Sequence, residues 1–133
     1  MPYYRVGTAH STPLSDAKNW NHRAYMDLAK QDHFLQLAED NPRMLCSEVP
    51  TEILDETSYD DVEPSDFFKD FLRIGYTQWH LQVHGRTPRG REQITNAIIV
   101  LWVRARRLHV NRVLSRPDPD LDKPFFSDEG LYE

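Results

Sequence analysis

Two histidines four residues apart, His80 and His84, form the pattern in this sequence that comes nearest to a metal site. On a helix, this spacing points two imidazoles toward one ion. A His-Glu-x-x-His motif would need Glu at position 81, which is Leu81, and a helical wheel places both histidines beside Lys69 and Arg73. Because neighbouring cations repel a metal ion, we interpret the histidines as part of a solvated polar face and expect no metal.

Near the C-terminus, three alternating carboxylates and a fourth further on imitate a calcium-binding loop: Asp118, Asp120, Asp122 and Glu129. An EF-hand needs glycine at the sixth position of this loop, where the chain has Lys123, and a helix must follow it. Only four residues remain after the loop. We therefore interpret the segment as an acidic, solvated tail.

The residues needed for nucleophilic or phosphate chemistry are missing from their usual patterns. The segment from Gly85 to Gly90 has the length of a phosphate-binding loop, but it continues Arg91-Glu92 where Lys and then Ser or Thr are required. Gly-x-Ser-x-Gly does not occur, and Cys46 lies in an irregular stretch without a nearby histidine. We expect no catalytic residue, no cofactor and no enzyme.

Charge is distributed in blocks along the chain. Its net charge is −5, yet residues 86–116 hold eight arginines against the single acid Glu92. Six acids without a base occupy residues 55–66, and the tail from 117 to 133 carries a further −5. A short basic segment is thus bracketed by two acidic ones, which favours ion pairing within the chain or across a protein interface.

The arginines do not form the single stripe that a helix tracking nucleic acid would present. Arg104 and Arg107 share one face of the expected helix, whereas Arg106 and Arg112 fall on its two apolar faces. We interpret them as ion-pair donors, to the acids of 55–66 or to another subunit. Nucleic-acid binding is therefore a third alternative and is not expected.

Composition sets the class of protein. The chain has 133 residues, 39% of them hydrophobic, and one cysteine. One cysteine permits neither an internal disulfide framework nor a Cys₄ zinc site, which favours a reducing intracellular compartment. The longest apolar run, Ala97 to Val103, is far shorter than the roughly 20 residues of a membrane span, so we expect no transmembrane helix.

The N-terminal half is expected to hold an extended arm, helices and a linker. Residues 1–12 show no sustained periodicity and predict the arm, while 13–41 predict one or two helices. The first covers about 13–30, and the second is a short helix that Asn41-Pro42 ends. Residues 42–64 contain prolines and the acidic run, which is typical of a linker.

The strongest pattern predicts a mostly α-helical fold around an antiparallel αα-hairpin over residues 65–116. Its first helix covers about 65–84, capped by Ser65 and stopped by Gly85. Its second covers about 88–114, because Thr87-Pro88 resembles a helix start and Pro117 forbids continuation. The short connection makes the two helices neighbours.

The second hairpin helix is apolar on two faces, and a helix that is apolar nearly all round must be buried nearly all round. One face holds Ile94, Ala97, Ile98, Leu101, Ala105 and Leu108. The expected helix 13–30 offers only a weaker apolar stripe for the other face, so we predict a partner protein there, with coverage by the N-terminal helices alone as the alternative. Tail aromatics that would be unfavourable in water extend this interface. The predicted interface residues are Ile99, Trp102, Val103, Arg106, Val110, Val113, Leu114, Phe125, Phe126 and Tyr132.

These observations predict a non-catalytic accessory subunit that stabilises a large multiprotein complex, with its N- and C-terminal arms extended along neighbouring subunits. The partners would be other protein subunits, and any membrane contact would come through the complex. A mitochondrial respiratory assembly is the favoured setting over the cytoplasm. The alternative is a small viral or phage protein that binds and inhibits a host factor.

Overall fold

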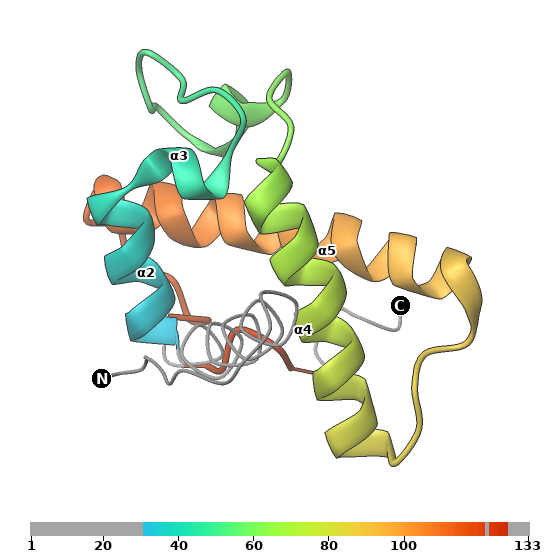
Figure 1. Cartoon of the computed structure of the whole chain (residues 1–133). Coiled ribbons are helices and arrows are strands. Elements are labelled where there is room, and N and C mark those ends of the chain that lie inside the picture. Colours follow the sequence, from blue (N-terminus) through green and yellow to red (C-terminus); the bar gives the residue numbers. More distant parts are fainter. Residues whose placement is uncertain (1–30, 122, 128–133) are drawn as a thin grey trace, which may run out of the picture.

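The computed structural model describes residues 31–121 and 123–127, and this part of the chain is built from helices (Figure 1). They are α2 (Gln31–Asp40), α3 (Pro42–Leu45), the 3-10 helix η1 (Glu56–Tyr59), α4 (Asp66–His84) and α5 (Gly90–Val113). The mostly α-helical class is therefore confirmed, as is the end of the short helix before Pro42. The predicted arm 1–12, the helix 13–30 and Tyr132 lie outside the described residues.

Helix α4 begins and ends where its sequence signals predict. The Ser65 hydroxyl accepts a hydrogen bond from the Phe68 N–H at 3.0 Å, which satisfies one of the free donors of the first turn. At the other end Gly85 has φ of 70°, a conformation that a residue without Cβ adopts without strain. Its N–H bonds to the Leu81 carbonyl at 2.9 Å and closes the helix.

Helix α5 begins two residues later than the Thr87-Pro88 signal predicts. Its first residue is Gly90, and the N-cap position is Arg89, whose side chain makes no capping bond. Instead the Arg89 N–H donates to Oε1 of Gln93 at 2.9 Å. The helix ends at Val113, as the prolines that follow require.

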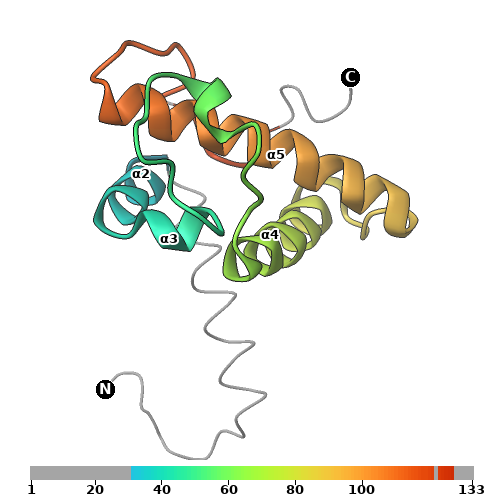
Figure 2. The same cartoon turned by 90° about the horizontal axis from the view of Figure 1, so that it is seen from above.

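The α4–α5 hairpin is confirmed, and its contacts run in antiparallel order. Phe68, early in α4, lies against Trp102, in the middle of α5, with ring centroids 6.1 Å apart. Tyr76, further along α4, meets Gln93 near the start of α5 at 3.1 Å. The ribbons cross in Figure 1, and the view from above in Figure 2 places α2 and α3 beside α4 on one side of α5.

Residues 42–64 are predicted as a linker, but 42–45 form α3 and 46–64 form a closed loop that belongs to the domain. Ser47 N–H bonds to the Glu63 carbonyl at 2.8 Å, and Cys46 pairs with Pro64 in an isolated β-bridge. Tyr59, carried by η1, is fully buried in the core. One large aromatic inside an acidic run thus fastens the whole loop to α5.

The tail also enters the core, which differs from the prediction that its aromatics face a partner. The ring of Phe125 stacks on Phe34 of α2 with centroids 4.7 Å apart, and Phe126 lies 5.7 Å from Phe71 of α4. Both tail residues are almost fully buried within the chain. They contribute to the core because packing against Phe34 of α2 and Phe71 of α4 removes them from water.

Candidate functional site

Helix α5 carries the residues predicted to face a partner, and four of them are exposed in the structure. Ile99 is 56% exposed and Val103 41%, and they stand one turn apart in the middle of the helix. Val113 and Leu114 are exposed at its C-terminal end. We define the α5 face as Ile99 and Val103, because side chains at i and i+4 form one continuous patch.

Two predicted interface residues of α5 are buried within the chain itself. Trp102 is 9% exposed and Val110 fully buried. The Tyr59 ring packs edge-on against Trp102, with centroids 6.2 Å apart. The loop 46–64 therefore covers Trp102 on the second apolar face of α5, and the burial of Trp102 and Val110 leaves neither available to a partner in this conformation.

Arg106 holds that loop in place. Its Nη1 lies 3.6 Å from the Asp60 carboxylate and 3.5 Å from the Tyr59 carbonyl, and its guanidinium sits 5.9 Å from the centre of the Trp102 ring. Charge pairing and cation–π contact act together here. Of the two partners predicted for this arginine, the acids of 55–66 are the ones it contacts.

The arginines nearest the tail bind it in the same way. Arg107 pairs with Asp118 at 3.0 Å and also with Asp120, while the Arg104 guanidinium donates to the Pro124 carbonyl at 2.7 Å. Although burial opposes ionisation of Asp118, hydrogen bonds from the Asp120 N–H, Asn111 and Arg107 lower its pKa. The first two carboxylates of the calcium-like pattern are thus occupied by protein donors.

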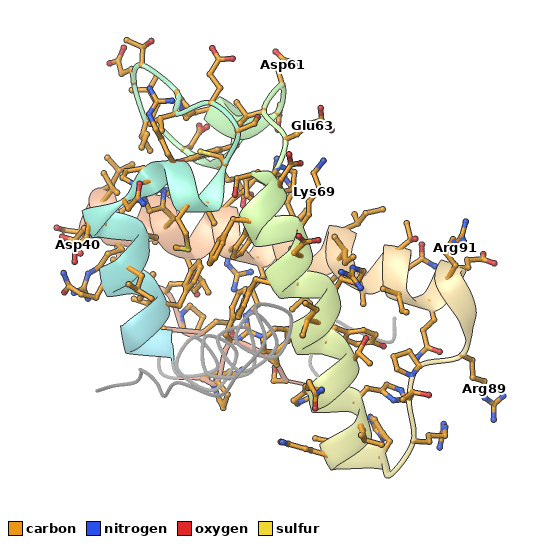
Figure 3. The ribbon with its side chains drawn as sticks, viewed as in Figure 1. Asp40, Asp61, Glu63, Lys69, Arg89 and Arg91 are labelled. Atoms are coloured by element: carbon orange, nitrogen blue, oxygen red, sulfur yellow. The ribbon has the colours of Figure 1, made fainter. Side chains whose placement is uncertain are left out.

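Three arginines differ from these: Arg86, Arg89 and Arg91 make no side-chain ion pair or hydrogen bond with another described residue, and all three are exposed. They lie in and just after the turn between α4 and α5, where the only acid is Glu92. Figure 3 shows Arg89 and Arg91 directed away from the ribbon. We call Arg86, Arg89 and Arg91 the basic tip.

A buried histidine lies beneath the basic tip, which corrects the prediction of a solvated polar face. His80 is 2% exposed, and its Nδ1 lies 2.7 Å from the Arg86 carbonyl. A carbonyl only accepts, so Nδ1 carries the proton and donates it. In the neutral ring Nε2 then accepts from the Gln93 amide at 3.3 Å. The turn folds back over this end of α4 and removes the imidazole from water.

Gln93 completes this network and fixes the turn at two points. Its Nε2 donates to the Tyr76 hydroxyl as well as to His80, while its Oε1 accepts from the Arg89 N–H. Both ring nitrogens of His80 and both polar atoms of the Gln93 amide therefore have hydrogen-bond partners. The backbone that bears Arg86 and Arg89 is held in one conformation.

A second buried histidine, His109, lies under the loop at the other end of the molecule. Its Nδ1 is 2.8 Å from the Tyr59 hydroxyl. Burial lowers the pKa of His109, and the Glu39 carboxylate only partly opposes this effect. Burial also raises the pKa of Tyr59 well above its usual value. Both groups are therefore neutral and form part of the folded core.

An open depression of about 370 Å³ lies where the loop 46–64 meets α4, lined on its polar side by Arg43, Glu63, Asp66 and Lys69. Cys46 borders it, and burial raises the pKa of this thiol, which disfavours the reactive thiolate. Two cations and two carboxylates line it, so the depression has no single charge to attract a ligand of one sign.

Two further properties concern the described residues alone. Within 31–121 and 123–127, no three His, Cys, Asp or Glu side chains are grouped so that they could hold a metal ion. In the same part of the chain no helix is long and apolar enough to cross a membrane. No family model, curated protein or solved structure matches the chain.

Ile99 and Val103 are exposed and stay a prediction as interface residues, whereas the His80–Gln93 network was not predicted from the sequence. The two residues are 13 apart and come from different helices, so no local spacing marks them. The usual capping-box spacing of three residues from Arg89 points to Glu92, whereas the side chain that accepts from the Arg89 N–H is Gln93, one residue further on.

Proposed function

We propose that this protein is a non-catalytic accessory subunit that stabilises a larger multiprotein assembly, and that the α5 face contacts a neighbouring subunit. The observation that supports this most directly is the exposure of Ile99 and Val103 in the middle of the longest helix. Ala97, Leu101 and Trp102 of the same apolar run belong to the core, and Ile98 packs against it.

The contribution of such a contact is modest but sufficient to favour one docking mode. Burying what is exposed of two β-branched side chains stabilises a complex by about 1 kcal/mol each. Both have stiff side chains, so little rotamer entropy is lost when they are covered. The exposed Val113 and Leu114 extend the contact toward the end of α5.

The setting that we propose is a mitochondrial respiratory assembly, which cell fractionation tests. The alternative, a viral or phage protein that inhibits a host factor, would use the same apolar face on a single soluble target. The two functions differ in stoichiometry, because a subunit has a fixed ratio to many other chains and an inhibitor is found with one.

The test is affinity purification of the tagged chain from its native source, followed by size-exclusion chromatography and mass spectrometry. The informative variant is Ile99→Asp, which places a charge in the α5 face. Its matched control is Leu54→Asp, at an equally exposed apolar residue on the loop (62% against 56% exposed). Circular dichroism establishes that both variants fold.

We expect the unmodified chain and Leu54→Asp to elute with one large complex at fixed stoichiometry, and Ile99→Asp to elute as a small species. Recovery of a single soluble target would favour the inhibitor. A folded Ile99→Asp variant that still elutes with the complex would remove the α5 face from the proposal.

A further inference from the structure

Thr87 lies exposed in the turn between α4 and α5, outside any helix. The backbone on each side of this threonine is held in place. The Arg86 carbonyl accepts a hydrogen bond from His80, and the Arg89 N–H donates one to Gln93. The segment between these two anchored residues therefore presents the Thr87 side chain to solvent from a fixed backbone.

The Thr87 hydroxyl makes no hydrogen bond with another described residue. Three other threonine hydroxyls differ from it in this respect. That of Thr57 donates to the Asp55 carboxylate, and those of Thr77 and Thr95 donate to the carbonyls four residues before them. A hydroxyl with such a bond must give it up before it can enter the active site of another protein. The Thr87 hydroxyl exchanges only a bond to water.

Pro88, which follows this threonine, restricts both the backbone of Thr87 and the enzymes that fit it. The proline ring clashes with a helical residue before it, so it favours extended backbone at Thr87. Proline also lacks an N–H. A dry pocket for the residue after the hydroxyl therefore accepts proline, whereas any other residue brings an unsatisfied donor into that pocket. Among the described residues, Thr87-Pro88 is the one place where proline follows serine or threonine.

Positive charge flanks Thr87 along the chain. Arg86 precedes it, and Arg89 and Arg91 follow at the second and fourth positions. The one acid of this segment is Glu92. A phosphoryl group on threonine adds a charge of about −1.5 to −2 at neutral pH, which matches the excess of the three arginines over the single acid. Phosphorylation of Thr87 would thus leave the basic tip with almost no net charge, and an arginine beside the phosphate stabilises the product.

We propose that Thr87 is a phosphorylation site for a proline-directed protein kinase. The co-reactant is ATP. The bond between its γ-phosphorus and the oxygen that bridges to the β-phosphate breaks, and a bond from the γ-phosphorus to Oγ1 of Thr87 forms. The hydroxyl proton passes to a base of the kinase, and ADP leaves. The site is separate from the α5 face, so either proposal can fail without the other.

The test is quantitative phosphopeptide mapping by mass spectrometry of the tagged full chain, purified from its native source with phosphatase inhibitors present. Thr87→Ala removes the acceptor hydroxyl. Pro88→Ala keeps the hydroxyl but introduces an N–H after it. The matched control is Thr51→Ala, at an exposed threonine that follows a proline, Pro50, and does not precede one. Circular dichroism establishes that all three variants fold.

We expect phosphate on Thr87 in the natural chain and, at the same occupancy, in Thr51→Ala. In Pro88→Ala the occupancy of Thr87 should fall by about tenfold, because the new N–H has no partner in the kinase pocket. In Thr87→Ala the modified peptide should disappear with no new site in the turn. The proposal is overturned if the natural chain carries no phosphate on Thr87, or if Pro88→Ala keeps the natural occupancy.

Discussion

The C-terminal half of α5 and the turn at its N-terminal end are both rich in arginine, yet they differ in what their arginines do. In the C-terminal half, Arg106 holds the loop at Asp60, Arg107 holds the tail at Asp118, and Arg112 pairs with Glu39 of α2 at 3.2 Å. At the basic tip the guanidinium groups face water. Identical residue types thus serve structure at one end and remain available for binding at the other.

The difference arises because the acids come from far along the chain. Glu39 is 73 residues away from Arg112, and Asp118 is 11 residues away from Arg107. The fold brings three acidic segments to the C-terminal half of α5 and none to the tip. A local excess of positive charge in the sequence therefore stays on the surface only where folding brings no acid to it.

The largest effect is expected from Phe125→Ala, which would remove the contacts that hold the tail against α2 and α4. The ring is fully buried and stacked on Phe34, so its removal leaves a cavity and should lower the free energy of unfolding by about 3–5 kcal/mol. Urea denaturation followed by circular dichroism measures this change. Val113→Ala, at an exposed site, should change it by less than about 0.5 kcal/mol. Equal effects would contradict the placement of the tail in the core.

Arg107→Ala and Arg89→Ala compare the two kinds of arginine directly. Arg107→Ala leaves the Asp118 carboxylate, 3% exposed, without its cation and should lower the free energy of unfolding by about 2 kcal/mol. Arg89→Ala removes no side-chain contact to a described residue and should cost less than about 0.5 kcal/mol. The same urea titration measures both variants. A cost for Arg89→Ala as large as that for Arg107→Ala would remove the distinction between the two ends.

A smaller, pH-dependent effect on the free energy of unfolding is expected from His109, in the C-terminal half of α5. Burial lowers the pKa of His109 in the folded protein below the ordinary value of 6.5, which applies to the unfolded chain. At a pH between the folded and the unfolded pKa, the unfolded chain therefore binds more protons than the folded protein. The free energy of unfolding should therefore fall as the pH drops below 6.5, and the contribution of His109 should be constant above it. Urea titrations on both sides of pH 6.5 measure the slope. His109→Gln should flatten it, and an unchanged slope would assign the effect to other groups.

Local signals in the sequence were enough to predict the hairpin. Ser65, Gly85 and Pro117 act through bonds to neighbouring residues, so their effects on helix ends are visible without the fold. The start of α5 was placed two residues early because Pro88 precedes the turn that Gly90, with φ of 73°, completes. The Thr87-Pro88 helix-start signal does not indicate that Gly90 has positive φ.

The burial of Tyr59, Phe125 and His80 could not be predicted from the sequence. Tyr59 and Phe125 are aromatics inside acidic, irregular segments, where neither period 2 nor period 3.6 marks a buried face. His80 shares a helical face with charged residues, and only the returning turn covers it. In each case the deciding contact joins segments that are remote in sequence or belong to different helices.

The central claim, that the α5 face contacts a neighbouring subunit, is tested most directly by photo-cross-linking in the native source. A photoreactive amino acid is placed at Ile99 and, as the control, at Asp70, an exposed position on α4. We predict that position 99 cross-links one polypeptide that also elutes with the large complex, and that position 70 does not. Absence of a cross-link at 99, or the same products in equal yield at both positions, would contradict the claim.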